Sequence, residues 1–251
     1  MTEMMPIEEY LAKGGRLTSP ENVPPRYRGE VLRLMASFVD SELAASAGFA
    51  DVINDAPGIT SRIAAARIVL EKADHAGRVL KVMSDFGANT SRYVGTHPWA
   101  SRVARDADIG AARQAGDMRL AVFHYPLAGW ADAVVMNVLQ GAAAVIQLQE
   151  YARLSYQPLA EVFRDITPRE ARHAELGREG LLQLVESDPS AVRKALDYWY
   201  PRVALGFGPK ESTRFELHHR FGLRHRTNED MRAEWTATIK AHLAEHGLKV
   251  A

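Results

Sequence analysis

The segment PREARH, at residues 168–173, gives the strongest indication of the fold in this 251-residue sequence. Its Glu170 and His173 are three residues apart, so a helix carries the carboxylate and the imidazole on one face. Helical bundles that bind metal ions place such Glu-x-x-His turns on helix faces that point inward. The stretch therefore predicts a helical bundle with a polar centre, to which other helices contribute.

The first long helix is predicted over residues 27–47 and contributes Glu42. Apolar side chains at Val31, Met35 and Phe38 follow one another at steps of four and three, which is typical of a buried helix face. The next step of four along the same stripe reaches Glu42. Acidic side chains are almost never fully buried unless they are paired or bind a metal ion, so Glu42 is a candidate site residue.

The second helix, predicted over residues 61–86, contributes Lys72 and His75. Both lie on an apolar stripe with the same four-three spacing, in the middle of the helix. Their neighbours Glu71 and Asp74 are spaced i,i+4 from arginines, which is typical of a solvated face. We therefore expect Lys72 and His75 to point inward, and Glu71 and Asp74 to point outward.

The third and fourth helices are less sharply bounded by the sequence. The third is predicted over residues 130–164, with Pro158 kinking it or ending it early. The fourth is predicted to begin at Thr167 and Pro168, which together with Glu170 resemble a capping box. Glu170 therefore either reaches back to the backbone of Thr167 or has a role in the core. The histidine three residues further on favours the core role.

Outside these four helices, a short helix is predicted around residues 101–116, and two more over 188–200 and 228–248. No strand alternation and no internal repeat are found. The sequence predicts an all-α fold, a four-helix bundle with additional C-terminal helices. We expect an extended lead-in over residues 1–25 and a single helical domain over residues 26–251.

The overall composition indicates which binding partners and which cellular compartment to expect. The 31 basic and 31 acidic side chains cancel, so neither nucleic acid nor a membrane surface is an expected partner. There is no cysteine, which excludes thiolate ligands and fits a reducing cytoplasm. The first ten residues lack an apolar core typical of secretory signals. The most apolar run, residues 131–148, is interrupted by polar side chains, so we expect no membrane span.

The segment 218–226 is locally basic, with three histidines and three arginines among its residues. It could contact the phosphates of a nucleotide-bearing ligand, because guanidinium groups bind phosphate well. A solvated surface is the favoured interpretation, since charged runs on surfaces are common.

Lys72 is the feature that argues against an ordinary metal site. An ammonium group has only hydrogen-bond donors and repels a metal cation. Lys72 could instead lie between Glu42 and Glu170 and supply the positive charge that a metal ion would otherwise provide. The alternative, that its side chain reaches out to solvent, is weaker for a residue in the middle of a helix.

Several short motifs, taken together in order and spacing, resemble a known family. They are DSEL at 40–43, DAP at 55–57, FHYP at 123–126, WAD at 130–132, SYQP at 155–158, FGP at 207–209 and RTNE at 226–229. The chain resembles the phenylacetic acid catabolic family, in particular the ferritin-like catalytic subunit of multicomponent phenylacetyl-CoA epoxidases.

The resemblance implies a ferritin-like fold and an oxygenase of aromatic acid catabolism. In that family two irons, reduced by a separate reductase, activate O2 and epoxidise the aromatic ring of a CoA thioester. A sister ferritin-like subunit supports the catalytic one, so the resemblance implies a homo- or hetero-oligomer. Four residues match the family's metal ligands: Glu42, His75, Glu170 and His173.

Two positions depart from the family pattern. The second-helix glutamate of the family is Lys72 here, and the third-helix aspartate falls on Gly141. Two interpretations follow. In one, Glu42, His75, Glu170 and His173 hold iron, one or two ions, or manganese, and Lys72, Glu42 and Glu170 act in catalysis, with Lys72 donating a proton or balancing charge. In the other, the chain is a metal-free structural subunit in which Lys72 bridges the two glutamates.

Overall fold

The computed structural model describes residues 5–95, 98–113 and 116–250. Within these residues the chain forms α-helices and short 3-10 turns but no β-strand, and one isolated parallel bridge joins Leu17 to Tyr156. The all-α prediction is therefore confirmed.

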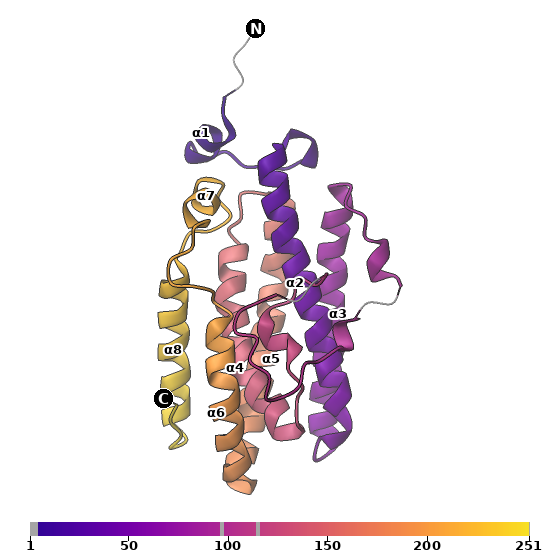
Figure 1. Cartoon of the computed structure of the whole chain (residues 1–251), viewed down its shortest axis with the longest axis vertical. Coiled ribbons are helices and arrows are strands. Elements are labelled where there is room, and N and C mark those ends of the chain that lie inside the picture. The colour runs from indigo at the N-terminus through magenta and orange to yellow at the C-terminus, as the bar shows by residue number, and fades with distance from the viewer. Residues whose placement is uncertain (1–4, 96–97, 114–115, 251) are drawn as a thin grey trace.

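The bundle consists of four long helices that run side by side (Figure 1). They are α2 (Pro25–Val52), α3 (Ile59–Asp85), α4 (Trp130–Tyr151) and α5 (Gln157–Ser187). The closest pairs are α2 with α3 and α4 with α5, and α3 also packs on α5. This is the ferritin-like arrangement, in which each helix presents one face to a common centre.

The remaining elements lie around the bundle. The helices are α1 (Ile7–Ala12), α6 (Pro189–Leu205), α7 (Phe215–Arg220) and α8 (Asn228–Ala244). The 3-10 turns are η1 (Pro20–Asn22), η2 (Ile53–Asp55), η3 (Ser91–Tyr93), η4 (Pro98–Ala100) and η5 (Ala121–His124). Helices α6 and α8 both pack on α4, where Trp199 and Trp235 are fully buried. The predicted C-terminal helices are thus confirmed, with α7 in addition.

The apolar stripes of α2 and α3 face the bundle interior, as predicted from their spacing. Val31, Met35 and Glu42 are buried on α2, and Lys72 and His75 are buried on α3 among apolar neighbours. Residues three or four apart lie on the same helix face. The apolar positions therefore predicted that the polar residues between them are buried as well.

The expected boundary between the third and fourth helices is wrong. Helix α4 ends at Tyr151, and α5 begins at Gln157 with Pro158 in its first turn, where proline is well tolerated. Helix α5 then continues through Pro168. The apolar stripe of α5 runs from Leu159 to Leu181 on both sides of the proline, so packing against α4 outweighs the hydrogen bond that the proline removes.

The helix predicted around residues 101–116 is not present in its described part, 101–113 and 116. The buried guanidinium of Arg119 donates hydrogen bonds to backbone and side-chain acceptors in this region. It donates to the carbonyl oxygens of Pro98, Trp99 and Ser101 at 2.8, 2.9 and 3.1 Å, and to the carboxylate of Asp117 at 2.6 Å. A buried side chain thus satisfies backbone carbonyl groups at the start of this irregular segment.

Residues 5–25 contain more structure than an extended lead-in. They form α1 and η1, and Leu17 and Val23 are buried. The backbone of Leu17 exchanges hydrogen bonds with Ser155 and Gln157 at the start of α5. The domain boundary expected near residue 26 stays a prediction.

One described helix, α4, is long and apolar enough to cross a membrane when judged by length and composition alone. The expectation of no membrane span stays a prediction. In the bundle, 67% of the most apolar window of α4 is buried against protein, as in the core helix of many bundles.

Candidate functional site

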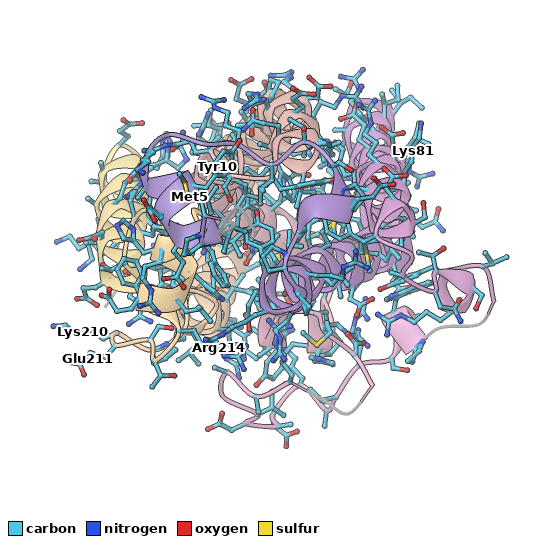
Figure 2. The ribbon with its side chains drawn as sticks, turned by 90° about the horizontal axis from the view of Figure 1, so that it is seen from above. Met5, Tyr10, Lys81, Lys210, Glu211 and Arg214 are labelled. Atoms are coloured by element: carbon cyan, nitrogen blue, oxygen red, sulfur yellow. The ribbon has the colours of Figure 1, made fainter. Side chains whose placement is uncertain are left out.

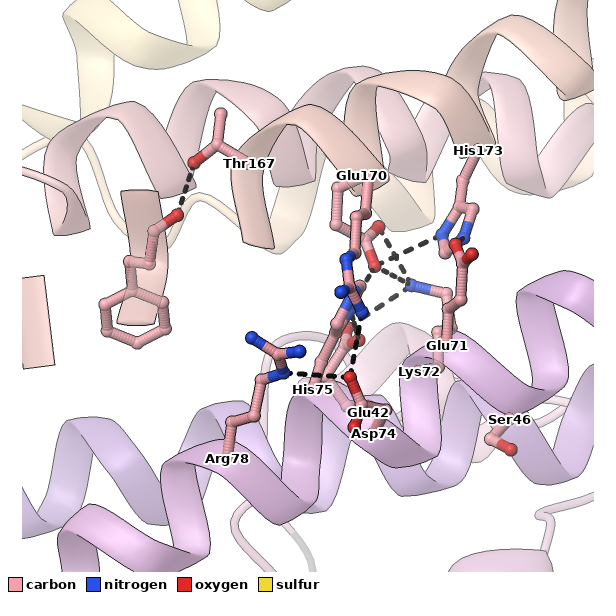
Figure 3. A network of polar contacts seen from close by, with 12 residues as sticks. Glu42, Ser46, Glu71, Lys72, Asp74, His75, Arg78, Thr167, Glu170 and His173 are labelled. Atoms are coloured by element: carbon pink, nitrogen blue, oxygen red, sulfur yellow. Dashed lines mark hydrogen bonds and ion pairs between the residues drawn. The ribbon is translucent and has the colours of Figure 1, made fainter. Parts of the chain in front are cut away.

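Five polar side chains from three helices meet in the middle of the bundle (Figure 3). Glu42 comes from α2, Lys72 and His75 from α3, and Glu170 and His173 from α5. None of the five residues is more than 7% exposed to solvent. The structure therefore brings together all five candidate residues that the helix spacing identified.

Lys72 lies between the two carboxylates. Its Nζ donates to both oxygens of Glu170 at 3.0 Å each and to Oε1 of Glu42 at 3.3 Å. Burial alone would lower the pKa of Lys72, but the charges of Glu170 and Glu42 outweigh it and raise the pKa above its ordinary value. The amine is therefore an ammonium ion that bridges α2, α3 and α5, and its side chain does not reach solvent.

The carboxylate of Glu170 is the centre of the cluster. Besides Lys72, Nδ1 of His75 lies 3.0 Å and Nδ1 of His173 lies 3.3 Å from its Oε1. Burial alone would raise the pKa of Glu170, but Lys72 and the two nearby imidazoles hold it well below its ordinary range. Glu170 is thus ionised, and it does not cap a helix, because Thr167 donates its hydroxyl to the carbonyl oxygen of Phe163 instead.

His75 contacts both carboxylates. Its Nδ1 lies 3.3 Å from Oε2 of Glu42 as well as 3.0 Å from Glu170. Burial would lower the pKa of His75, but the hydrogen bonds to Glu170 and Glu42 outweigh it and raise the pKa. The two negative charges of the cluster are therefore balanced by protein groups, the ammonium of Lys72 and the readily protonated ring of His75.

Glu71 was expected to point outward, and this prediction is wrong. Its Oε2 lies 2.7 Å from Nε2 of His173, and its side chain is only 27% exposed. Asp74, in contrast, pairs with Arg78 and Arg169 on the surface, as expected for a solvated face. The i,i+4 spacing of Glu71 from an arginine suggested an exposed position. The contact with His173 joins α3 to α5 and depends on how these two helices pack.

A cavity of about 290 Å³ lies beside the cluster. Glu42, Lys72 and Glu170 contribute to its lining. Its walls are mostly apolar and come from α2, α4 and the segments around residues 120 and 207: Phe38, Leu120, Phe123, Met136, Leu148 and Phe207. Arg113 and Arg224 also line it. The sequence patterns did not predict this cavity.

The residues of the basic segment 218–226 make contacts with several different parts of the protein. Arg224 lines the cavity and donates to Gln147 and Asn228 at 3.0 and 2.9 Å, so the expectation of a purely solvated face is wrong for this residue. His218 and Arg226 form ion pairs with glutamates on other segments.

The residues of the cluster do not fit a pair of iron ions. Ferritin-like dinuclear sites use a carboxylate from each of two helices and a Glu-x-x-His turn from each of the other two. Here Lys72 replaces the glutamate of one turn, and Gly141 contributes no ligand from α4. A Cβ atom added to Gly141 would lie 3.1 Å from Cβ of Ala174 on α5, so a carboxylate there would force the two helices apart.

A smaller set of ligands remains. One ligand atom each from Glu42, His75 and Glu170 lie within 4.8 Å of one another, whereas His173 is not part of this group. Lys72 donates to both carboxylates of the set, so a cation could enter only after the amine had lost its proton or turned away. The assignment of these residues as metal ligands stays a prediction.

The chain was compared with known proteins. A family model described as "Phenylacetic acid catabolic protein" matches residues 5–251. One component of the 1,2-phenylacetyl-CoA epoxidase of Escherichia coli (strain K12) is 23% identical over 216 residues, which are 84% of this chain and 64% of that protein. The chain therefore spans less than two thirds of the length of that relative. Because the family model covers almost the whole chain, the protein belongs to the phenylacetic acid catabolic family.

Proposed function

We propose that the chain is a metal-free subunit of an oxygenase assembly of the phenylacetyl-CoA epoxidase type. The observation that carries this proposal is the position of Lys72, whose Nζ lies within 3.3 Å of three carboxylate oxygens from two helices. A protein cation thus stands at the position where the family pattern has a glutamate. We therefore derive no reaction step through a metal ion.

Electrostatics supports this assignment. Two buried carboxylates that face each other are stable only with a compensating charge close by. Lys72 supplies it directly, and the raised pKa of His75 allows a second positive charge. The cluster would therefore hold α2, α3 and α5 together with no metal ion, which is the property required of a supporting subunit.

The cavity beside Lys72 supports a role in binding an acyl-CoA. Its apolar walls suit an aromatic acyl group, and the guanidinium groups of Arg113 and Arg224 suit phosphates. A CoA thioester combines these two chemical features. On this proposal a separate reductase and a catalytic ferritin-like partner in the cytoplasm complete the assembly.

The competing candidate is an oxygenase subunit with a single iron or manganese ion. The observation in its favour is the approach of Glu42, His75 and Glu170 to within 4.8 Å. Carboxylate and imidazole ligands suit both metals. The candidate requires a neutral or displaced Lys72, against the raised pKa of its amine.

Metal analysis of tag-free protein, purified from cells supplied with iron and manganese, separates the two candidates. The metal-free subunit should contain neither metal in stoichiometric amount. Stoichiometric iron or manganese would overturn the proposal. The variant Lys72→Glu should lose stability in chelator and regain it with ferrous iron, whereas Lys81→Glu, on the exposed side of α3 (Figure 2), should do neither.

Acyl-CoA binding is tested separately by equilibrium titration with an aryl-acyl CoA thioester. Arg224→Gln should weaken binding, because it removes a cation from the cavity lining. Arg220→Gln is the matched control, since the side chain of Arg220 is 55% exposed and does not line the cavity. If the two variants bind the acyl-CoA with equal affinity, the cavity is not the acyl-CoA binding site.

A further inference from the structure

A second group of side chains of the kinds that can bind a metal ion lies at the C-terminal end of α8, and none of its residues lines the cavity. One ligand atom each from His242, Glu245 and His246 lie within 4.8 Å of one another. The two imidazole rings are 5.2 Å apart between centroids. His242 lies in the last turn of α8, and Glu245 and His246 follow directly after its end, where the backbone hydrogen bonds of Glu245 and His246 to Ala241 and Leu243 keep the three side chains together.

The imidazole of His242 is not fully hydrogen-bonded by the part of the chain that the structure describes. Its Nε2 is buried without a hydrogen-bond partner among the described residues. Its Nδ1 lies 3.6 Å from Oε2 of Glu245, which is too long for a hydrogen bond. The nitrogen of His242 that faces Glu245 is therefore Nδ1, and a metal ion shared with that carboxylate would be bound by this nitrogen.

The spacing suits a tetrahedral metal ion after a small movement. Zn²⁺ binds imidazole nitrogen and carboxylate oxygen at about 2.0–2.2 Å, so its ligand atoms lie roughly 3.3 Å apart. Glu245 can make the required adjustment, because its side chain is 69% exposed. His242 is held more firmly, with only 16% of its side chain exposed, and the neighbouring Leu243 is fully buried.

The local electrostatics mostly favours a cation. The C-terminal end of a helix carries a partial negative charge, and α8 ends at Ala244, within this group. Glu245 adds a full negative charge. Arg178 lies near enough to oppose a cation, but it forms no ion pair with Glu245 among the described residues.

We propose that His242, Glu245 and His246 form a binding site for a divalent transition-metal ion of the zinc type, which fixes the last turn of α8 on the bundle. Three protein ligands leave one coordination position for water. The order of affinities should follow the ligand chemistry, with Zn²⁺, Ni²⁺ and Cu²⁺ bound and Mg²⁺ and Ca²⁺ not bound. The proposal does not depend on the function proposed for the buried cluster.

The test is a titration of the tag-free, full-length chain with ZnCl2 in competition with a chromophoric chelator. We expect one Zn²⁺ per chain with a dissociation constant of about 1 μM. His246→Ala and Glu245→Gln should each weaken binding at least about tenfold, since even residues behind the ligands contribute that much. Both side chains are at least partly exposed, so these variants should fold.

Two matched controls are available in the same chain. Glu229→Gln lies at the other end of α8, and His219→Ala removes an exposed histidine from α7. Neither should change zinc affinity. The proposal is overturned if the wild-type chain binds no zinc below millimolar concentration, or if His246→Ala binds as tightly as His219→Ala. Zinc that persists in His246→Ala but disappears on changing Glu42 would also overturn it, because the ion would then lie in the buried cluster.

Discussion

The buried cluster of Glu42, His75 and Glu170 and the surface group of His242, Glu245 and His246 meet the same geometric criterion. In each, three side chains bring one ligand atom to within 4.8 Å of the others. They differ in what lies among the ligands. In the bundle, the Lys72 ammonium binds both carboxylates, whereas the group on α8 has no protein cation bound to it among the described residues and is open to solvent.

This difference shows that the number and spacing of ligands do not by themselves define a metal site. The charge inside the cluster decides whether a cation gains or loses energy on entering. In the buried cluster the protein has already compensated the carboxylates. At the end of α8 the compensation comes from a more distant arginine, so a metal ion can still be accommodated.

The largest effect is expected from Lys72→Met, which removes the protein cation from the buried cluster. Glu42 and Glu170 would remain buried without their partner, so the free energy of unfolding should fall by about 3–5 kcal/mol. Urea denaturation at neutral pH in the presence of chelator measures the change. Lys81→Met, on the exposed side of the same helix, should change it by less than about 0.5 kcal/mol. Equal losses in both variants would mean that Lys72 does not balance the cluster.

A pH titration of stability should separate the wild type from Lys72→Met by slope, because the raised pKa of His75 also stabilises the wild type to some extent as the pH is lowered. In the wild type the pKa of Glu170 is lower in the folded than in the unfolded chain. Its stabilising contribution is therefore present above the ordinary value of 4.5 and is lost as the pH falls through the lower folded pKa. The wild type should accordingly gain no stability from Glu170 when the pH is lowered.

In Lys72→Met, burial is no longer outweighed by the ammonium, so the pKa of the buried carboxyls should rise above its unfolded value. Lowering the pH from about 7 to about 5 should then stabilise this variant. Thermal unfolding across this range gives both curves. Parallel curves for the two proteins would contradict the charge-balance model of the buried cluster.

Zinc should stabilise the chain through α8 and not through the buried cluster. At a free concentration of a hundred times the dissociation constant, binding contributes about 2.7 kcal/mol, which corresponds to a rise in Tm of roughly 5–10 °C. Differential scanning fluorimetry measures the shift. In His246→Ala the shift should disappear. A shift that survives in this variant would show that the buried cluster also admits a cation, and the contrast between the two groups would fail.

The smallest effect is expected from Glu71→Gln, which weakens the contact between α3 and α5 beside the cluster. The hydrogen bond to His173 becomes neutral, so the free energy of unfolding should fall by about 1 kcal/mol. Glu179→Gln is a suitable control, because the side chain of Glu179 is 57% exposed. If the two variants are equally stable, Glu71 belongs to the solvated face that the sequence suggested.

Much of the buried cluster could be predicted because its information is local. The four-three spacing of apolar residues on α2, α3 and α5 indicates which side chains point inward, and it identified all five polar residues. The continuation of α5 through Pro168 could not be predicted, since the local cost of a proline is overcome only by packing against α4. The contact of Glu71 with His173 was missed for a similar reason.

Residue order and helical periodicity were enough to predict the helical class, the family resemblance and the depth of the five polar residues of the buried cluster. The tertiary structure alone decided which charges meet. It brought Lys72 between Glu42 and Glu170, formed a cavity beside them, and left Nε2 of His242 without a partner among the described residues. Whether a set of ligands is compensated depends on distances between helices, and these are set by packing across the whole bundle.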